Sequence, residues 1–328
     1  MNSKVLKIGT RESQLAVWQA NRVKELLAEA GYESELVYIK SEGDIDLQTP
    51  LYEIGVQGIF TRSLDIALLN NRIDLAVHSM KDVPTQLPNG IVQSAVLKRA
   101  SFKDLLVYKG EISALEETLG FVNGQWSIVN KDETLQAIHH SPFTIATSSI
   151  RRKAQWLNRY PAHRVENLRG NVNTRLRKVA ESDWNGAIFA AAGLERINLR
   201  PEKSIELDWM LPAPAQGAII AVCRDGDTFS YEACQPFNNA ETATCTKVEK
   251  EFLRTLLGGC STPISALAQV ENGHLHFRGN IFTADGCQRV DIEKTVTINE
   301  AEGLGERAAL ELLANGGQAV ADSIHHER

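Results

Sequence analysis

Short apolar segments alternate with helical patterns in the N-terminal part of this chain, and this alternation constrains the fold more than any other feature. Val5–Ile8 has the composition of a buried strand, and apolar residues then recur at helical spacing from Leu15 to Ala30. Residues 35–39 and 73–77 are further strand candidates, with a helical pattern around 64–68. Alternating strands and helices favour a mostly parallel sheet whose strand-end loops can bind a ligand.

The same pattern starts again after a polar stretch. Strands are predicted at 144–146, 164–168 and 187–191, and helices at 150–157 and around 172–179. Leu211–Pro214, with two prolines, reads as a crossing segment, and Gly217–Cys223 as one more strand. Because a chain of 328 residues exceeds what one hydrophobic core sustains, we expect two or three domains.

The C-terminal part has a different pattern. A helix carries Val248, Phe252 and Leu256, and the pairs Asn272-Gly273 and Asp285-Gly286 each separate strand-like segments, as in β-hairpins. A helix from about residue 304 to 313 follows. We therefore expect an α+β unit here, and we interpret the weakly patterned residues 110–141 as an extended surface excursion.

Composition excludes several classes of protein. The net charge of −6 argues against broad attraction to nucleic acid or to an anionic membrane. Five widely spaced cysteines suit reduced thiols, and the N-terminus has no signal-peptide core, so we expect a cytoplasmic protein. The paired histidines at 139–140 and 325–326 lack matching ligands, which makes a metal site unexpected.

Two clusters of polar residues follow predicted strands of the first unit. In Thr10–Ser13, the pattern favours a helix cap at Ser13 and a solvated Arg11 over an anion site. In His78–Pro84, the Asp82 carboxylate could stabilise a cation or accept an N–H bond. A weak surface pair between Lys81 and Asp82 is an equal alternative.

Arginines gather at predicted strand ends of the second unit. The set comprises Arg151 and Arg152 after Thr147 and Ser149, followed by Arg169, Arg175 and Arg196. Guanidinium groups bind carboxylates through two parallel hydrogen bonds, so this set favours a cleft for a polycarboxylate over a scatter of solvated arginines.

Cys260 differs from the other cysteines because it lies between two glycines and a nearby proline. A thiol on such an open loop can act as a nucleophile or as an attachment point, although most lone cysteines are inert apolar residues.

Eight runs, in order along nearly the whole chain, resemble the porphobilinogen deaminase family. They are residues 9–16, 58–60, 78–84, 147–152, 168–172, 192–194, 211–213 and 258–260. The resemblance implies an enzyme of porphyrin and haem biosynthesis that joins four porphobilinogen molecules head to tail, releases ammonia and yields hydroxymethylbilane. It also implies a covalent dipyrromethane cofactor on Cys260, a monomer, and no nucleic-acid or membrane partner.

The resemblance also implies a role for each site residue. Asp82 would be the catalytic group, contacting pyrrole N–H groups and stabilising the cation left when ammonia departs. The cofactor would be held by Asp82 together with Ser13, Ser79, Lys81, Thr147, Ser149, Arg151, Arg152 and Arg169. Substrate would be bound by Arg11, Phe60, Arg169, Arg175 and Arg196.

The implied fold has two α/β domains like those of periplasmic binding proteins and a smaller C-terminal α+β domain with a three-stranded antiparallel sheet. We expect domain 1 at residues 1–99 and 214–237, domain 2 at 103–211 and domain 3 at 240–328. Two residues depart from the family pattern: Gln57 stands where many members have lysine, and Ala215 replaces a common glycine. The second change predicts a stiffer hinge.

Two other readings remain possible on the residues alone. Two lobes with arginines in their cleft could form a binding module that captures an anion, but such a module has no need of an accessible thiol at Cys260. A nucleic-acid binder could use Arg151, Arg152 and the basic stretch at 175–178, but the acidic total and the lack of interleaved aromatics oppose it.

Overall fold

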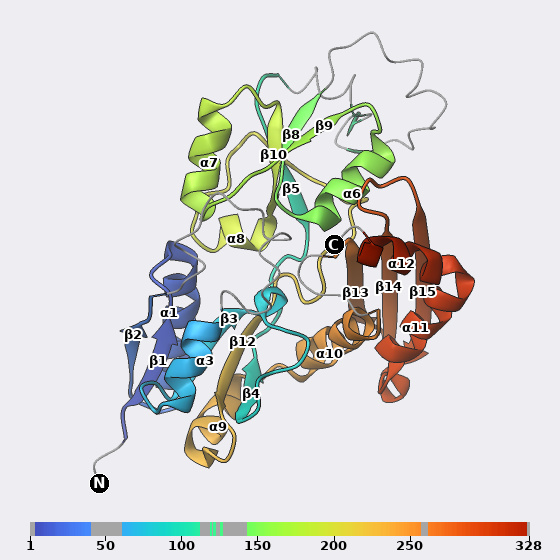
Figure 1. The fold of residues 1–328 in the computed structure, drawn as a ribbon. Coiled ribbons are helices and arrows are strands. Elements are labelled where there is room, and N and C mark those ends of the chain that lie inside the picture. Colours follow the sequence, from blue (N-terminus) through green and yellow to red (C-terminus); the bar gives the residue numbers. More distant parts are fainter. Residues whose placement is uncertain are drawn as a thin grey trace.

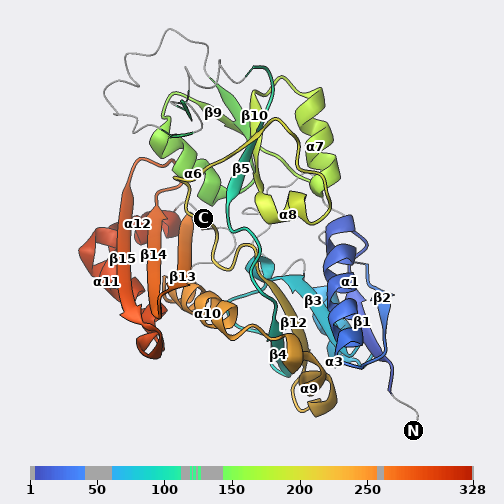
Figure 2. The same ribbon diagram turned by 180° about the vertical axis from the view of Figure 1, so that it is seen from behind.

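The computed structural model describes residues 4–40, 61–111, 119, 121–122, 125–126, 143–256 and 262–326. Figures 1 and 2 show three bodies: a lower lobe that begins with the N-terminus, an upper lobe, and a C-terminal unit that lies beside both. In the part of the chain that the structure describes, no helix has both the length and the apolarity required to cross a bilayer.

The lower lobe contains a five-stranded sheet of order β2-β1-β3-β12-β4. Its strands are β1 (Leu6–Thr10), β2 (Ser34–Tyr38), β3 (Leu75–Ser79), β4 (Ile91–Val96) and β12 (Ile219–Arg224). Helix α1 (Gln14–Glu29) packs on one face and α3 (Arg62–Leu69) on the other, so β3 is buried on both faces. Helix α9 (Thr228–Cys234) joins the α1 side.

The upper lobe repeats this arrangement with the order β11-β5-β10-β8-β9. Its strands are β5 (Asp104–Tyr108), β8 (Thr144–Ala146), β9 (Arg164–Glu166), β10 (Gly186–Ala190) and β11 (Ser204–Glu206). Helix α6 (Ile150–Arg159) packs on one face through Trp156, while α7 (Val172–Glu181) and α8 (Ala191–Glu195) cover the other. Of the predicted excursion at 110–141, the structure describes residues 110–111, Leu119 and two short strands, β6 (Phe121–Val122) and β7 (Gln125–Trp126).

The C-terminal unit is a three-stranded antiparallel sheet with helices on one face, as expected. Its strands are β13 (Ile264–Glu271), β14 (His274–Phe282) and β15 (Arg289–Thr297), and its helices are α10 (Ala240–Thr255), α11 (Leu304–Leu312) and α12 (Gln318–His326). Both hairpin predictions are confirmed: Asn272 and Gly273 have positive φ angles of 51° and 78° between β13 and β14, and Gly286 lies in the β14–β15 loop.

The prediction of mostly parallel sheets is confirmed, because in each five-stranded sheet four strands run in one direction and one strand, β12 or β5, runs against them. In the lower lobe β1 pairs in parallel with β2 and β3, but β12 is antiparallel to both β3 and β4. In the upper lobe β5 is antiparallel to β10 and β11. Parallel neighbours need a crossover connection, usually a helix. β12 instead enters from the connector at 207–218, which returns the chain from the upper lobe (Figure 1).

Candidate functional site

A cleft lies in the lower lobe where β1 and β3 end. These strands are parallel neighbours, so the loops at their carboxyl ends meet at the same sheet edge. The cleft is lined by Arg11, Ser13, Gln19, Ser79 and Asp82, among others. Ser13 also caps α1, since its hydroxyl accepts a hydrogen bond from the Ala16 amide at 3.4 Å, and the Gln19 amide donates to the Ser79 hydroxyl at 2.9 Å.

His78 lines the same cleft from the end of β3. It is only 6% exposed, and its Nε2 atom has no hydrogen-bond partner among the described residues. Burial, and next the charge of Arg11, lower the pKa of His78 to about 4, so the ring is neutral near pH 7. A buried ring nitrogen without a partner is costly.

Asp82 ends a short 3-10 turn, Met80–Asp82, directly after β3. The Met80 amide donates to the Ala218 carbonyl at 3.0 Å, which ties the turn to the connector before β12. The neighbouring Lys81 ammonium donates to the Gln216 side-chain oxygen at 3.4 Å. The turn therefore faces the connector between the lobes.

Lys81 lies where charges from both lobes converge. Burial lowers the pKa of Lys81 to about 8; the charge of Asp82 opposes this shift, and that of Arg152 from the upper lobe adds to it. The structure thus brings the Lys81–Asp82 turn within electrostatic reach of the upper-lobe arginines.

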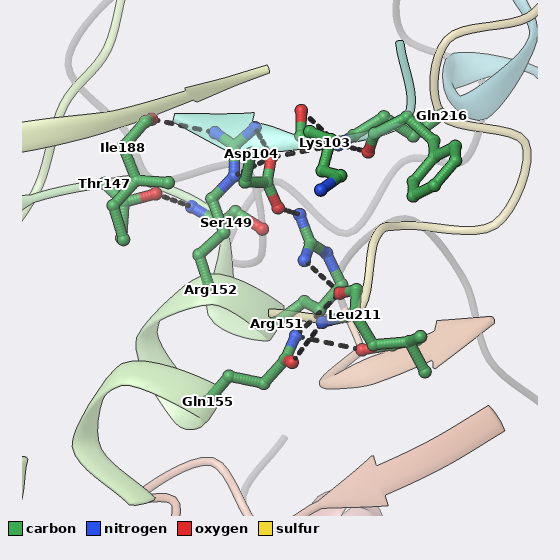
Figure 3. A network of polar contacts seen from close by, with 12 residues as sticks. Lys103, Asp104, Thr147, Ser149, Arg151, Arg152, Gln155, Ile188, Leu211 and Gln216 are labelled. Atoms are coloured by element: carbon green, nitrogen blue, oxygen red, sulfur yellow. Dashed lines mark hydrogen bonds and ion pairs between the residues drawn. The ribbon is translucent and has the colours of Figure 1, made fainter. Parts of the chain in front are cut away.

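The buried carboxylate of Asp104, at the start of β5, organises the first two of those arginines (Figure 3). Arg151 donates to Asp104 at 2.8 Å, and Arg152 donates at 2.7 and 3.1 Å. The Gln216 amide adds a bond of 2.9 Å to the same carboxylate. Burial alone would raise the pKa of Asp104, but the two guanidinium groups hold it well below its usual range.

Asp104 did not enter the sequence-based prediction. The signal was present, because Asp104 precedes the apolar run Leu105–Val107, which is typical of a buried strand. The pairing itself spans 47 and 48 residues along the chain, and no local pattern encodes it.

The two arginines keep some donors for a ligand. Besides Asp104, Arg151 donates to the Leu211 carbonyl at 2.7 Å and Arg152 to the Ile188 carbonyl at 2.9 Å. The Nε atom of Arg151 is buried and has no hydrogen-bond partner among the described residues. An orphaned guanidinium N–H beside a second cation fits a carboxylate-bearing group such as a dipyrromethane.

Three more arginines lie around this cluster. Arg169 is 4% exposed. Arg175 donates to the Gly170 carbonyl at 2.7 Å; burial, and next Arg152, lower its pKa to about 10, while Asp82 opposes the shift. Arg196 has a different setting: it donates to the Gly217 carbonyl at 2.7 Å, and its guanidinium lies 5.7 Å from the centre of the Trp18 ring.

Of the predicted site residues, two are not placed. Phe60 and Cys260 lie outside the described residues, as does the departing residue Gln57. Thr147 is buried, and its hydroxyl accepts the Ser149 amide at 3.2 Å at the start of α6 (Figure 3). The second departure, Ala215, has a left-handed φ of 61°, a conformation that costs a residue with a side chain roughly 1–2 kcal/mol.

Sequence comparisons give one family over nearly the whole chain. Residues 6–232 match the family model described as porphobilinogen deaminase, dipyromethane cofactor binding domain, and residues 243–314 match the porphobilinogen deaminase C-terminal domain. A porphobilinogen deaminase of Chloroherpeton thalassium is 37% identical over 97% of this chain and 96% of its own length. One of Syntrophotalea carbinolica is 37% identical over 98% and 96%. Among solved structures, the methionine-binding protein MetQ is similar with a TM-score of 0.40 at 12% identity, over 73% of this chain and 91% of that one.

Proposed function

Because the chain belongs to the porphobilinogen deaminase family, we propose that the junction of its two α/β lobes is the active site, with Asp82 as the catalytic carboxylate. The enzyme joins four porphobilinogen molecules head to tail, releases ammonia and yields the linear tetrapyrrole hydroxymethylbilane. This transferase acts in tetrapyrrole biosynthesis and uses a dipyrromethane cofactor.

One observation carries the assignment of the site: Asp82 and Lys81 from the lower lobe lie within electrostatic reach of Arg152 and Arg175 from the upper lobe. Each pyrrole unit carries an acetate and a propionate side chain. Asp104 is paired with Arg151 and Arg152, whereas Asp82 lines the cleft, so the two carboxylates can have separate tasks. The cations bind the substituents, and Asp82 remains for the ring nitrogen.

The bound dipyrromethane supplies the pyrrole carbon to which the first substrate unit is added. Arg151 and Arg152 would hold its carboxylates with the N–H groups that Asp104 leaves unused, and Ser13, Ser79 and Lys81 would complete its binding from the lower lobe. We assign its attachment to Cys260 and a stacking contact to Phe60, both from the family pattern.

Asp82 would act on the incoming unit. When ammonia leaves, the pyrrole becomes a cation whose charge is shared by the ring nitrogen. A fixed carboxylate that accepts the pyrrole N–H gains most of its interaction after this charge develops, so it lowers the barrier. The turn at Met80–Asp82 is tied to the connector through Ala218, which keeps the carboxylate in place before the charge forms.

We further propose that the enzyme is a cytoplasmic monomer with domain limits at 1–99 and 214–237, 103–211, and 240–328. The sheets support this division, because β12 belongs to the lower lobe although it follows the whole upper lobe in sequence.

The test compares Asp82→Asn with Asp82→Glu in single-turnover release of ammonia. Each variant is first shown by intact mass to carry two linked pyrrole units. We expect Asn to slow release by about 10²–10³, the usual cost of removing one electrostatic stabiliser, and Glu to retain part of the rate. An Asn variant as fast as the parent would show that the cation is stabilised by another group.

A further inference from the structure

We propose that Lys250 of helix α10 is a positioning residue for the Asp82 turn, and that it connects the cysteine-bearing C-terminal unit to the catalytic carboxylate. This inference rests on the proposed role of Asp82. It concerns a residue of the C-terminal unit.

Helix α10 lies between the lower lobe and the C-terminal sheet in both views (Figures 1 and 2). Val248, Phe252 and other residues of one face pack into the core of that sheet. Near its N-terminus the helix is tied to the lower lobe, since the Arg99 amide donates to the Thr242 hydroxyl at 3.1 Å. The helix ends at Thr255, and the chain then enters the segment that contains Cys260.

Lys250 points from this helix to the lower lobe. Its ammonium group donates to the carbonyl of Val83, the residue directly after Asp82. The side chain is only 9% exposed, although lysine side chains are rarely buried. A buried ammonium group is a costly arrangement for a lysine that only fills space, because an apolar residue would fill the same space without the desolvation penalty.

The helical turn that carries Lys250 is fixed by buried hydrogen bonds of its neighbour. The preceding residue, Glu249, is fully buried and accepts hydrogen bonds from Arg99 at 2.6 and 3.1 Å. Its carboxylate also accepts the amides of Ala215 at 2.5 Å and Ala268 at 2.7 Å. Lys250 therefore extends from a helical turn that is fixed to the lobe connectors and to the C-terminal sheet.

The Asp82 turn is consequently held at both ends. The Met80 amide bonds to Ala218 at the start, and the Val83 carbonyl accepts Lys250 at the end. After Val83 the chain continues into Pro84, whose fixed φ makes the exit of the turn stiff. Loss of the Lys250 bond would release the downstream end, and a displacement of about 1 Å at a reacting group can cost roughly 100-fold in rate.

The experiment measures kcat, KM and thermal unfolding for Lys250→Met and Lys250→Arg. The matched control is Lys247→Met on the same helix, because Lys247 is 53% exposed and pairs with Glu302. We expect Lys250→Met to lower kcat by about 10-fold or more with KM within about twofold, since the bond orients a reacting group and binds no substrate. Arg at this position should restore most of the rate, and Lys247→Met should match the parent. Lys250→Leu serves as a second apolar variant if the first does not accumulate as folded protein.

A double variant separates positioning from a general structural effect. If Lys250 acts through Asp82, adding Lys250→Met to Asp82→Asn slows the reaction no further. The inference is overturned if Lys250→Met slows the Asp82→Asn variant by the same factor as it slows the parent. It is also overturned if Lys250→Met alone keeps the parental kcat. If Asp82→Asn alone is as fast as the parent, the proposed role of Asp82 falls and this inference falls with it. A slow Asp82→Asn beside a normal Lys250→Met rejects the inference alone.

Discussion

The pKa of Lys81 is lowered to about 8, so this side chain loses its proton in a range where most lysines stay charged. We expect kcat/KM for porphobilinogen to fall as the pH rises through about 8, because a neutral amine no longer attracts carboxylates. Lys81→Arg keeps its charge over this range. A pH profile of kcat/KM for both proteins checks the prediction: the decline near pH 8 should be present in the parent and absent, or moved to higher pH, in the variant.

As the pH rises, the contribution of Lys81 to the free energy of unfolding should increase, in the opposite direction to kcat/KM. Because the folded-state pKa of Lys81 lies below the unfolded value of 10.5, the unfolded chain binds more protons between about pH 8 and 10.5. Raising the pH through this window therefore favours the folded protein at this residue. Parallel profiles of activity and unfolding would distinguish loss of ligand binding from unfolding in alkali. If both fall together in the parent and in Lys81→Arg, another group controls the alkaline limit.

Asp104 holds two buried arginines together, and its charge is essential to that arrangement. Asp104→Asn would leave Arg151 and Arg152 as neighbouring buried cations, and breaking a buried pair in this way costs about 3–5 kcal/mol. Urea denaturation measures the loss. The control is Asp208→Asn, which removes an ion pair of Lys103 from a carboxylate that is 55% exposed and should cost roughly 0–1 kcal/mol. Equal stabilities of the two variants would contradict the structural role of Asp104.

At the scale of elements, most of the longer helices and the hairpins followed from the sequence, whereas α8, α9 and α12 were not predicted. The helix expected from Leu15 to Ala30 is α1, and Asn272-Gly273 forms the turn between β13 and β14. Their signals are local: apolar spacing in the first case and residues that tolerate positive φ in the second.

The strands β4 and β5 and the direction of β12 did not follow from the sequence. Pairing direction depends on where the connector at 207–218 carries the chain, and no residue pattern within β12 records that path. The site residues also divide into those with a local sequence signal and those without one. The position of Lys81 and Asp82 after a strand left a surface ion pair as an equal alternative, and the family resemblance implied their place in the site. Asp104, His78 as a neutral cleft residue, and Lys250 depend on contacts between segments distant in sequence.

At the scale of the whole molecule, the C-terminal unit is fixed to the upper lobe by the β14–β15 loop. The Asn158 amide of α6 donates to the Gly286 carbonyl at 2.7 Å. A Cβ atom at Gly286 would lie 2.4 Å from the Ala154 carbonyl oxygen and 2.9 Å from the Asn158 nitrogen. The two bodies therefore meet at a contact that admits only glycine.

Gly286→Ala should weaken this contact and lower the unfolding free energy. Gly273→Ala is the matched control, because Gly273 has nearly the same φ, 78° against 77°, and nothing within 4 Å of the added Cβ. Both variants carry the strain of positive φ, roughly 1–2 kcal/mol, and only the first adds the clash. Chemical denaturation should show a larger loss for Gly286→Ala. If the losses are equal, the hairpin loop does not hold the C-terminal unit against α6.

The place of β12 between β3 and β4 affects how the chain folds during its synthesis. As the polypeptide leaves the ribosome, β3 and β4 emerge early, but the strand that joins them is complete only at Arg224, after the entire upper lobe has been synthesised. At elongation rates of about 5–20 residues per second this interval lasts roughly 6–25 s. During it the edges of β3 and β4 have unpaired backbone groups, which is the state in which strands join foreign partners. The upper lobe contains all its strands before the lower lobe does, so the lobe that begins with the N-terminus is the later of the two to complete its sheet.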